Sequence, residues 1–477
     1  MTRRRSSCTA ILVGKKATVD GSTIIARDED GYDGINPKTF QVYPAKDYTG
    51  EKYVSKYSGV EITLDGKGCR FTAMTDGTQK IPGRWDEQGI NEYNVAMSST
   101  ETETTNRRVL GYDPLVKNGI DEDSMLYLTL PFVKSAREGV QRLGHLIERY
   151  GTGETNGIAF SDKDEVWYLE TGGGHHWAAQ RIPDNAYAIA PNITCIQEID
   201  FSDKDNFMAA EGIRDFVDQH HLNPDPGTFN YRNIFGTHDE ADQYYNTPRS
   251  WYGQKMFTPS VKQDPTSTDI PFIQRADRQI SVDDVQDFLS SHYQNTPYDP
   301  FGSYASGDEK DQKRFRSIAM DRNQESSVLQ IRNDVPAKYA AIQWINMGFY
   351  SYSPYVPFFT NINDTPANYK FATSDAFDGS AYWMYKRLET LVEPHYHDFI
   401  YQINAYRDDA YSYGLSQIEK ADAAAEKLDG DELTDYLTKV NAETAKEVTE
   451  RTHQLMNKFV HWTLLHSKYQ FERGDNL

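Results

Sequence analysis

Two β-prone runs near the beginning of the chain constrain the fold more than any other feature. Residues 8–13 read CTAILV, residues 22–26 read STIIA, and the dipeptide Asp20-Gly21 between them is a hairpin turn signal. We therefore predict that the chain folds back on itself early. The charged stretch from Arg27 to Asp30 then returns to the start of the first strand, where Cys8 lies.

The rest of the chain combines strands with helices. The segment from Ser135 to Tyr150 has apolar residues at helical spacing, with Ser135 as N-cap and Gly151 as the stop. Beyond Ser380 the apolar period is helical on both sides of Gly430, and one stripe comprises Leu415, Ile418, Ala421, Ala425 and Leu428. Further strand-like runs stand at residues 52–57, 94–98, 166–170, 186–190 and 339–344. This mixture predicts an α+β fold with a helical tail rather than an alternating parallel sheet.

Composition excludes several classes of protein. The 477 residues include 50 basic and 71 acidic side chains, and the net charge of -21 argues against nucleic acid and anionic membranes as partners. No apolar run approaches the roughly 18 residues of a membrane helix. Three cysteines without a CxxC pair fit a reducing compartment better than a disulfide framework, and the apolar run after Arg5 is too short for a secretion signal. We expect a cytoplasmic protein.

Cys8 is the first candidate for chemistry, although a small buried cysteine is the ordinary alternative. If the bond between Ser7 and Cys8 were cut, Cys8 would carry a thiol with an ordinary pKa of about 8.5 and an α-amine with one of about 7.7 to 8.0. A nucleophile and its general base would then share one residue. No second methionine precedes Cys8, so this chemistry requires cleavage after Ser7.

Arg27 and Asp30 would flank this nucleophile after the hairpin has formed. A guanidinium near a thiol lowers the pKa of the thiol, and a carboxylate can orient an α-amine. The alternative for both residues is a solvated charged loop.

The opening run CTAILVGKKATVDGSTIIARDEDG, residues 8–31, resembles the start of the dipeptidase A family. These are cysteine dipeptidases of the N-terminal-nucleophile hydrolase superfamily, related to penicillin V acylase and bile-salt hydrolase. The resemblance continues in order to about residue 360 through the blocks GINEYNVAMSS (89–99), WYLETGGGHHWAAQRIPDNAYAIAPN (167–192), TPRSWYGQK (247–255) and SPYVPFF (353–359). It implies a four-layer αββα hydrolase domain over residues 8–379, followed by a helical region over residues 380–477.

The resemblance also implies the nucleophile side of an active site. Cys8 matches the nucleophile, and residues 1–7 match a short propeptide that is lost by self-cleavage. Arg27 and Asp30 match the Arg-x-x-Asp pair beside that nucleophile, where Arg27 would poise the thiol and Asp30 the α-amine.

On the oxyanion side, Asn192 matches an asparagine whose side-chain amide helps to hold the oxyanion, and Arg249 matches a supporting arginine. A preorganised donor of this kind contributes roughly 2.7 to 4 kcal/mol to transition-state stabilisation. Acylase relatives carry a second asparagine where this chain has Glu101, so only a backbone N–H could serve there. On residue type alone, Asn192 could be satisfied by its neighbours and Arg249 could belong to a structural ion pair.

These features predict a metal-independent cysteine dipeptidase without a cofactor, which cleaves unblocked dipeptides through an acyl-enzyme. The histidine pairs at 175–176 and 395/397 lack the carboxylate or cysteine partners of a zinc site. We expect small peptide substrates and, as in related hydrolases, a homo-oligomer. Two alternatives stay open: an acylase on a non-peptide amide of the penicillin V or bile-salt type, and a non-catalytic binding protein similar to secernins.

Overall fold

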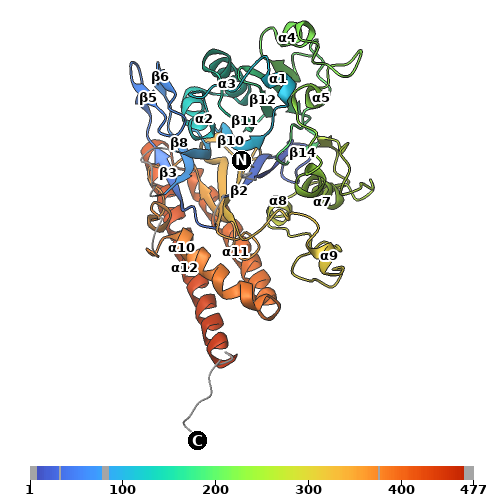
Figure 1. Ribbon diagram of the computed structural model, residues 1–477. Helices are drawn as coiled ribbons and strands as arrows, with labels where there is room; N and C mark the ends of the chain where they lie inside the picture. Colours follow the sequence, from blue (N-terminus) through green and yellow to red (C-terminus); the bar gives the residue numbers. More distant parts are fainter. Residues whose placement is uncertain (1–7, 32–33, 78–84, 374–376, 467–477) are drawn as a thin grey trace, which may run out of the picture.

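Two antiparallel sheets form the centre of the molecule (Figure 1). The structure, a computed structural model, describes residues 8–31, 34–77, 85–373 and 377–466, and only the backbone of residues 100–102. The first sheet, called the β1 sheet below, has the strand order β16-β14-β1-β2-β17-β18-β19. The second, called the β10 sheet, has the order β15-β13-β12-β11-β10-β9-β8-β3.

The strands of the β1 sheet come from both halves of the chain. They are β1 (Thr9–Val13), β2 (Thr23–Asp30), β14 (Tyr187–Ala190), β16 (Ile273–Gln274), β17 (Asn323–Ile331), β18 (Ala341–Met347) and β19 (Val356–Phe359). The β10 sheet is built from a shorter stretch of sequence. It contains β3 (Lys38–Tyr43), β8 (Phe71–Asp76), β9 (Asp86–Ile90), β10 (Ala96–Glu103), β11 (Thr155–Ser161), β12 (Val166–Gly172), β13 (His176–Ile182) and β15 (Phe207–Ala209). Two small ribbons pair β4 (Lys46–Asp47) with β7 (Lys67–Gly68) and β5 (Lys52–Val54) with β6 (Glu61–Thr63).

The predicted hairpin at the start of the chain is confirmed as β1 and β2, in which Thr9 lies opposite Asp28. Gly21 takes a φ of +76° in the turn, a conformation that glycine adopts without a steric cost. Because side chains alternate along a strand, Leu12 joins the core between the sheets while Val13 joins the core under the helices. By the same alternation, Cys8 and Arg27 face the space between the sheets.

Helices cover the outer face of each sheet, which completes four layers (Figure 1). On the β10 sheet lie α2 (Glu122–Thr129) and α3 (Ala136–Tyr150); on the β1 sheet lie α7 (Thr247–Phe257), α8 (Val282–Leu289), α10 (Ala381–Val392), α11 (Tyr396–Ala425) and α12 (Gly430–His466). The shorter helices are α1 (Arg107–Leu110), α4 (Ile213–Gln219), α5 (Tyr231–Phe235), α6 (Asp242–Tyr245) and α9 (Glu309–Gln312). The inner faces meet where β2 contacts β10, β11 and β12. The α+β prediction with a helical tail is confirmed.

The helix predicted from Ser135 is confirmed with its cap, because the Ser135 side chain accepts a hydrogen bond from the Glu138 backbone N–H. The tail also forms as expected, and Ile418, Ala421 and Ala425 are buried. Leu415 differs, with 45% of its surface exposed.

The exposure of Leu415 follows from the way α11 meets the β1 sheet. The buried face of α11 passes through Gly414, where an added side chain would contact Pro357 and Trp344. The neighbouring position therefore turns away from the sheet.

The strand predicted at 339–344 forms as β18 from Ala341 to Met347, because Ala337–Tyr339 make a 3-10 turn before it. Two other predicted strands also change their bounds for local reasons. The run at 52–57 ends as β5 at Val54, because the Ser55 hydroxyl accepts hydrogen bonds from the backbone N–H groups of Tyr57 and Ser58. The run at 94–98 begins later, at Ala96, because the Asn91 side chain ties up a turn in which Asn94 has a φ of 59°. In the described part of the chain, no helix combines the length and apolar character that would span a membrane.

Candidate active site

Cys8 lies directly before β1 and is 4% exposed. Nη1 of Arg27, from the returning strand β2, stands 3.5 Å from its Sγ atom. Arg27 is itself fully buried. Two carboxylates hold its guanidinium: Nη2 donates to Glu87 at 2.6 Å, and Nη1 donates to Glu122 at 3.0 Å. The hairpin and the packing of the two sheets together place a fixed cation against the thiol.

The electrostatics of this enclosed site keep the thiol neutral. Burial raises the pKa of the Cys8 thiol well above its ordinary value; Arg27 opposes this effect, while Glu122 and Glu29 add to it. A neutral thiol is a weak nucleophile. Chemistry at Cys8 therefore needs a base or a more open environment than the one in this state of the chain.

Arg249, in the first turn of α7, connects the Cys8 backbone to Asn192. Its Nη1 atom donates to the carbonyl oxygen of Cys8 at 2.5 Å and to the Thr9 hydroxyl at 2.9 Å. Its Nη2 atom donates to the side-chain oxygens of Asn192 at 2.7 Å and Asn246 at 2.5 Å. A planar guanidinium can hold several acceptors in one fixed geometry, which a lysine ammonium cannot.

Asn192 follows β14, the neighbour of β1 in the sheet, and is buried. Because its Oδ1 atom accepts from Arg249, its amide is oriented with Nδ2 as the donor. The loop after Asn192 is held by Glu170, which accepts the backbone N–H groups of Cys195 at 2.5 Å and Ile196 at 3.0 Å. This arrangement fixes a side-chain donor beside the start of β1.

Asp30 lies on the face of β2 opposite to Arg27. Its carboxylate accepts hydrogen bonds from Arg316 and Asn323, whereas Asp28 accepts the backbone N–H of Thr9. Burial lowers the pKa of Arg316 to about 10, and Asp28 and Cys8 counteract this effect, so Arg316 lies within electrostatic range of both. The assignment of Asp30 to the α-amine stays a prediction.

Two further expectations concern parts of the chain that the structure does not describe. The segment 1–7, expected to be a propeptide, lies outside them. Glu101 stands in β10 opposite Asn156, next to an irregularity in strand register, but its side chain is not described. A backbone N–H donor at this position remains a prediction.

Sequence reasoning did not identify Asn246, Glu87, Glu122 and Arg316. Asn246 directly precedes the TPRSWYGQK block, and Glu87 stands two residues before the GINEYNVAMSS block, so an extension of either block would have included them. Glu122 and Arg316 lie in segments without a local signal, and only the tertiary structure brings them to the site.

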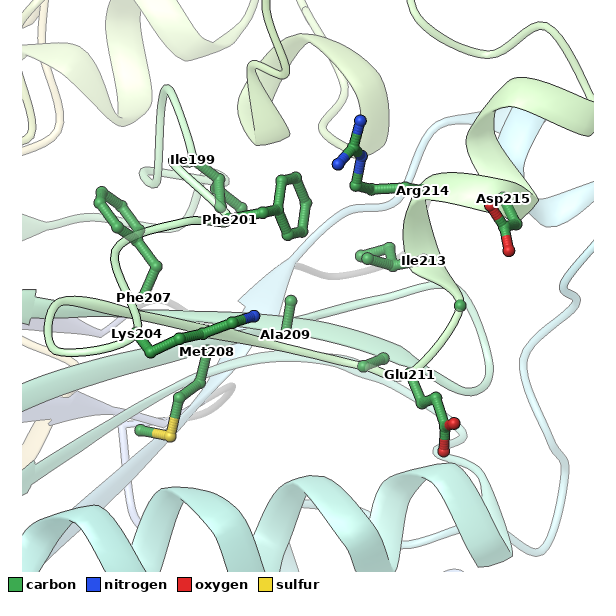
Figure 2. Close-up of a pocket in the computed structure, with 12 residues that line it drawn as sticks. Ile199, Phe201, Lys204, Phe207, Met208, Ala209, Glu211, Ile213, Arg214 and Asp215 are labelled. Atoms are coloured by element: carbon green, nitrogen blue, oxygen red, sulfur yellow. The ribbon is translucent and has the colours of Figure 1, made fainter.

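Two other features that could have marked a site are separate from Cys8: a surface cavity and the histidine pair at 175–176. A cavity of about 310 Å³ lies between β15 and α4, where Phe201 and Ile213 line it together with Arg214 (Figure 2), and no predicted site residue is part of its wall. His175 and His176 both bind the Asp113 carboxylate, at 2.9 Å and 2.7 Å.

Among the described residues, one group of carboxylates is close enough to share a metal ion, namely Glu29, Asp76 and Glu87. Their cation in this structure is the ammonium of Lys38, which lies 2.5 to 2.7 Å from an oxygen of each.

Comparison with known proteins gives consistent matches over the whole chain. Residues 7–409 match the model of Peptidase family C69. A probable dipeptidase from Latilactobacillus sakei is 44% identical over 472 residues, covering 99% of this chain and 98% of that protein. A probable dipeptidase B from Lactococcus lactis is 42% identical over 99% of both chains, and dipeptidase A from Lactobacillus helveticus is 42% identical over 96% of this chain and 97% of that one.

Proposed function

This chain belongs to peptidase family C69, and from that membership we propose that it is a cysteine dipeptidase that hydrolyses unblocked dipeptides through Cys8. The observation that carries the assignment of the site is the fork of Arg249. It joins the carbonyl oxygen of Cys8 to the side chain of Asn192, two residues that are far apart in sequence. With Arg27 against the thiol, a nucleophile, a cation and an amide donor meet at the start of one strand.

The proposed reaction begins with removal of residues 1–7. This exposes the α-amine of Cys8, which supplies the base that the neutral thiol needs. The α-amine takes the thiol proton while Sγ attacks the carbonyl carbon of the dipeptide. Nδ2 of Asn192, with a backbone N–H, stabilises the negative charge on the carbonyl oxygen.

The second half of the reaction releases both products. The C–N bond breaks, and the leaving amine receives the proton from the α-ammonium of Cys8. Water, deprotonated by the same α-amine, then attacks the thioester and releases the second amino acid with the free thiol. In this scheme Arg27 stabilises the thiolate, and Asp30 acts on the α-amine side through the network that includes Arg316.

The intact mass and amino-terminal sequence of wild type beside Cys8→Ala test the nucleophile. We expect wild type to begin at Cys8, and Cys8→Ala to keep residues 1–7 and to lose hydrolysis. Full activity of Cys8→Ala would refute the proposal. Retention of residues 1–7 in an inactive wild type would favour a non-catalytic binding protein.

A substrate panel tests the class of amide. We expect cleavage of unblocked dipeptides and little cleavage of a tripeptide, an amino-blocked dipeptide or penicillin V. Preference for penicillin V or a conjugated bile salt would instead identify an acylase. The proposal includes a homo-oligomer in the cytoplasm, and light scattering of the purified chain measures the oligomeric state.

A further inference from the structure

A buried charge network extends from Cys8 into the space between the sheets. We define this inter-sheet network as Arg27 and Glu29 of β2, Lys38 of β3, Asp76 of β8 and Glu87 of β9. The side chains of Arg27 and Lys38 are fully buried, and that of Glu87 is 1% exposed. None of these residues except Arg27 was assigned a role in the reaction.

Glu87 is the link between the two cations of the network. Its Oε2 atom accepts from Arg27 at 2.6 Å, and its Oε1 atom accepts from Lys38 at 2.5 Å. Although burial alone would raise it, Lys38, Glu29 and Arg27 hold the pKa of Glu87 at about 2. Glu87 therefore remains an anion, and each of its oxygens is bound by a different cation.

Lys38 balances a surplus of acid. Besides Glu87 it contacts Glu29 at 2.7 Å and Asp76 at 2.5 Å. Burial, together with Glu87, raises the pKa of Glu29 well above its ordinary value, and Lys38 opposes this effect. Without Lys38, the whole charge of Glu87 would act on Arg27 and, through it, on the thiol.

We propose that Glu87 and Lys38 are positioning residues of the Cys8 site: Glu87 holds the guanidinium of Arg27 against Sγ, and Lys38 neutralises Glu87 so that Arg27 can stabilise the thiolate. This inference rests on the proposed role of Cys8 as the nucleophile. A network with only a structural role would keep the same contacts, but its neutralisation would change the stability of the fold and leave the titration of the thiol where it is.

A positioning role predicts that Lys38→Met and Glu87→Gln shift the pKa of the Cys8 thiol in opposite directions, which a purely structural role does not predict. Lys38→Met leaves Glu87 uncompensated, which disfavours the thiolate. Glu87→Gln removes a negative charge next to Arg27 but keeps an oxygen to accept from Nη2, which favours the thiolate. The double variant removes one charge of each sign, so its effect on the thiol should nearly cancel.

The experiment is the pH dependence of alkylation of Cys8 by iodoacetamide in the purified full chain, followed by mass spectrometry of the Cys8 peptide. Cys8→Ala shows that the signal comes from this thiol. The other ionisable groups near Cys8 or the network are not mutated in any variant: Arg27, Asp28, Glu29, Glu122, Arg249, Arg316 and Glu325.

We expect the alkylation midpoint to rise by about one pH unit in Lys38→Met, to fall in Glu87→Gln, and to return close to wild type in the double variant. Below the midpoint, one pH unit corresponds to an alkylation rate about tenfold lower at a given pH. As a matched control, the buried Arg332 forms an ion pair with the partly buried Asp422 at 2.6 Å, at the opposite end of β17 from Asn323. Arg332→Met should leave the midpoint unchanged.

Midpoints that shift in the same direction in both single variants, or that do not shift, would overturn the inference. If Lys38→Met does not fold, Glu87→Gln and the double variant carry the same test, and a double variant that stays at the midpoint of Glu87→Gln overturns it. Failure of the proposed function has a different signature, because hydrolysis by Cys8→Ala would refute the nucleophile whatever the midpoints are.

Discussion

The two faces of strand β2 surround the same cysteine with charge, but the balance of charge differs. On the face between the sheets, which we call the acid-rich face, Arg27 and Glu29 belong to the inter-sheet network, in which carboxyl groups outnumber cations. On the face toward the helices, which we call the balanced face, Asp28 and Asp30 are matched by Arg249 and Arg316, and Arg322 lies beside Arg316.

The difference shows that the balance of charge decides whether a buried carboxyl is fixed as an anion or can exchange a proton near neutral pH. On the helix-side face, burial raises the pKa of Asp28 only to about 6, because Arg316 and Arg249 oppose it, so this carboxyl is an anion at neutral pH. On the inter-sheet face, burial and then Glu87 raise the pKa of Glu325 to about 7. The balanced face therefore holds fixed ion pairs, and the acid-rich face holds protons that it can lose near neutral pH.

The largest expected effect is on the balanced face, at Arg249. Arg249→Lys keeps the charge but cannot bridge Cys8, Thr9 and Asn192, so we expect dipeptide hydrolysis to fall by at least about 100-fold. Steady-state kinetics measure this loss, with Arg332→Lys as a control that should retain activity. Activity within a few-fold of wild type would show that hydrolysis needs only the positive charge at this position and not the hydrogen bonds of the guanidinium.

The next effect concerns the ion pair of Asp30 with Arg316. Asp30→Asn removes the carboxylate that pairs directly with the buried Arg316 guanidinium, and we expect a loss of roughly 3 to 5 kcal/mol in the free energy of unfolding. Urea denaturation of Asp30→Asn and of the double variant with Arg316→Met measures it. The double variant should recover part of the loss; equal stability of wild type and Asp30→Asn would contradict the balanced-face description.

On the acid-rich face, stability should depend on pH through Glu325. Its pKa is about 7 in the folded chain and about 4.3 in an unfolded one, so its neutral form stabilises the fold below pH 4 and this contribution is lost as pH rises through about 7. Glu325→Gln stays neutral and should lose on the order of 3 kcal/mol less than wild type between pH 4.5 and pH 8. Urea midpoints over this range measure the difference, and an equally steep loss in the variant would contradict the assignment.

The smallest effect should come from an exposed ion pair, which serves as the baseline for both faces. Lys446 and Glu450 on α12 stand 3.9 Å apart and are more than half exposed. Glu450→Gln should change the free energy of unfolding by less than about 0.5 kcal/mol, and less still at high salt. A larger change would mean that the large effects expected on the two faces of β2 do not depend on burial.

Local sequence signals predicted the elements that depend on neighbouring residues. The Asp20-Gly21 turn predicted the hairpin, and Ser135 and Gly151 predicted both ends of α3. Local hydrogen bonds also explain where prediction was wrong, since the Asn91 side chain delays the start of β10. Periodicity alone could not exclude Leu415 from the buried stripe, because close approach at Gly414 sets the buried face of α11.

The sequence by itself determined that Cys8 and Arg27 meet, because a short turn and strand pairing require only adjacent segments. The family resemblance added Asn192 and Arg249 but not the contacts that join them. Only the tertiary structure decided that Arg249 holds Cys8 to Asn192, and that Glu87 and Lys38 stand behind Arg27. The physical reason is that these contacts depend on how two sheets and a helix pack, and no local propensity of a strand specifies its partner across a sandwich.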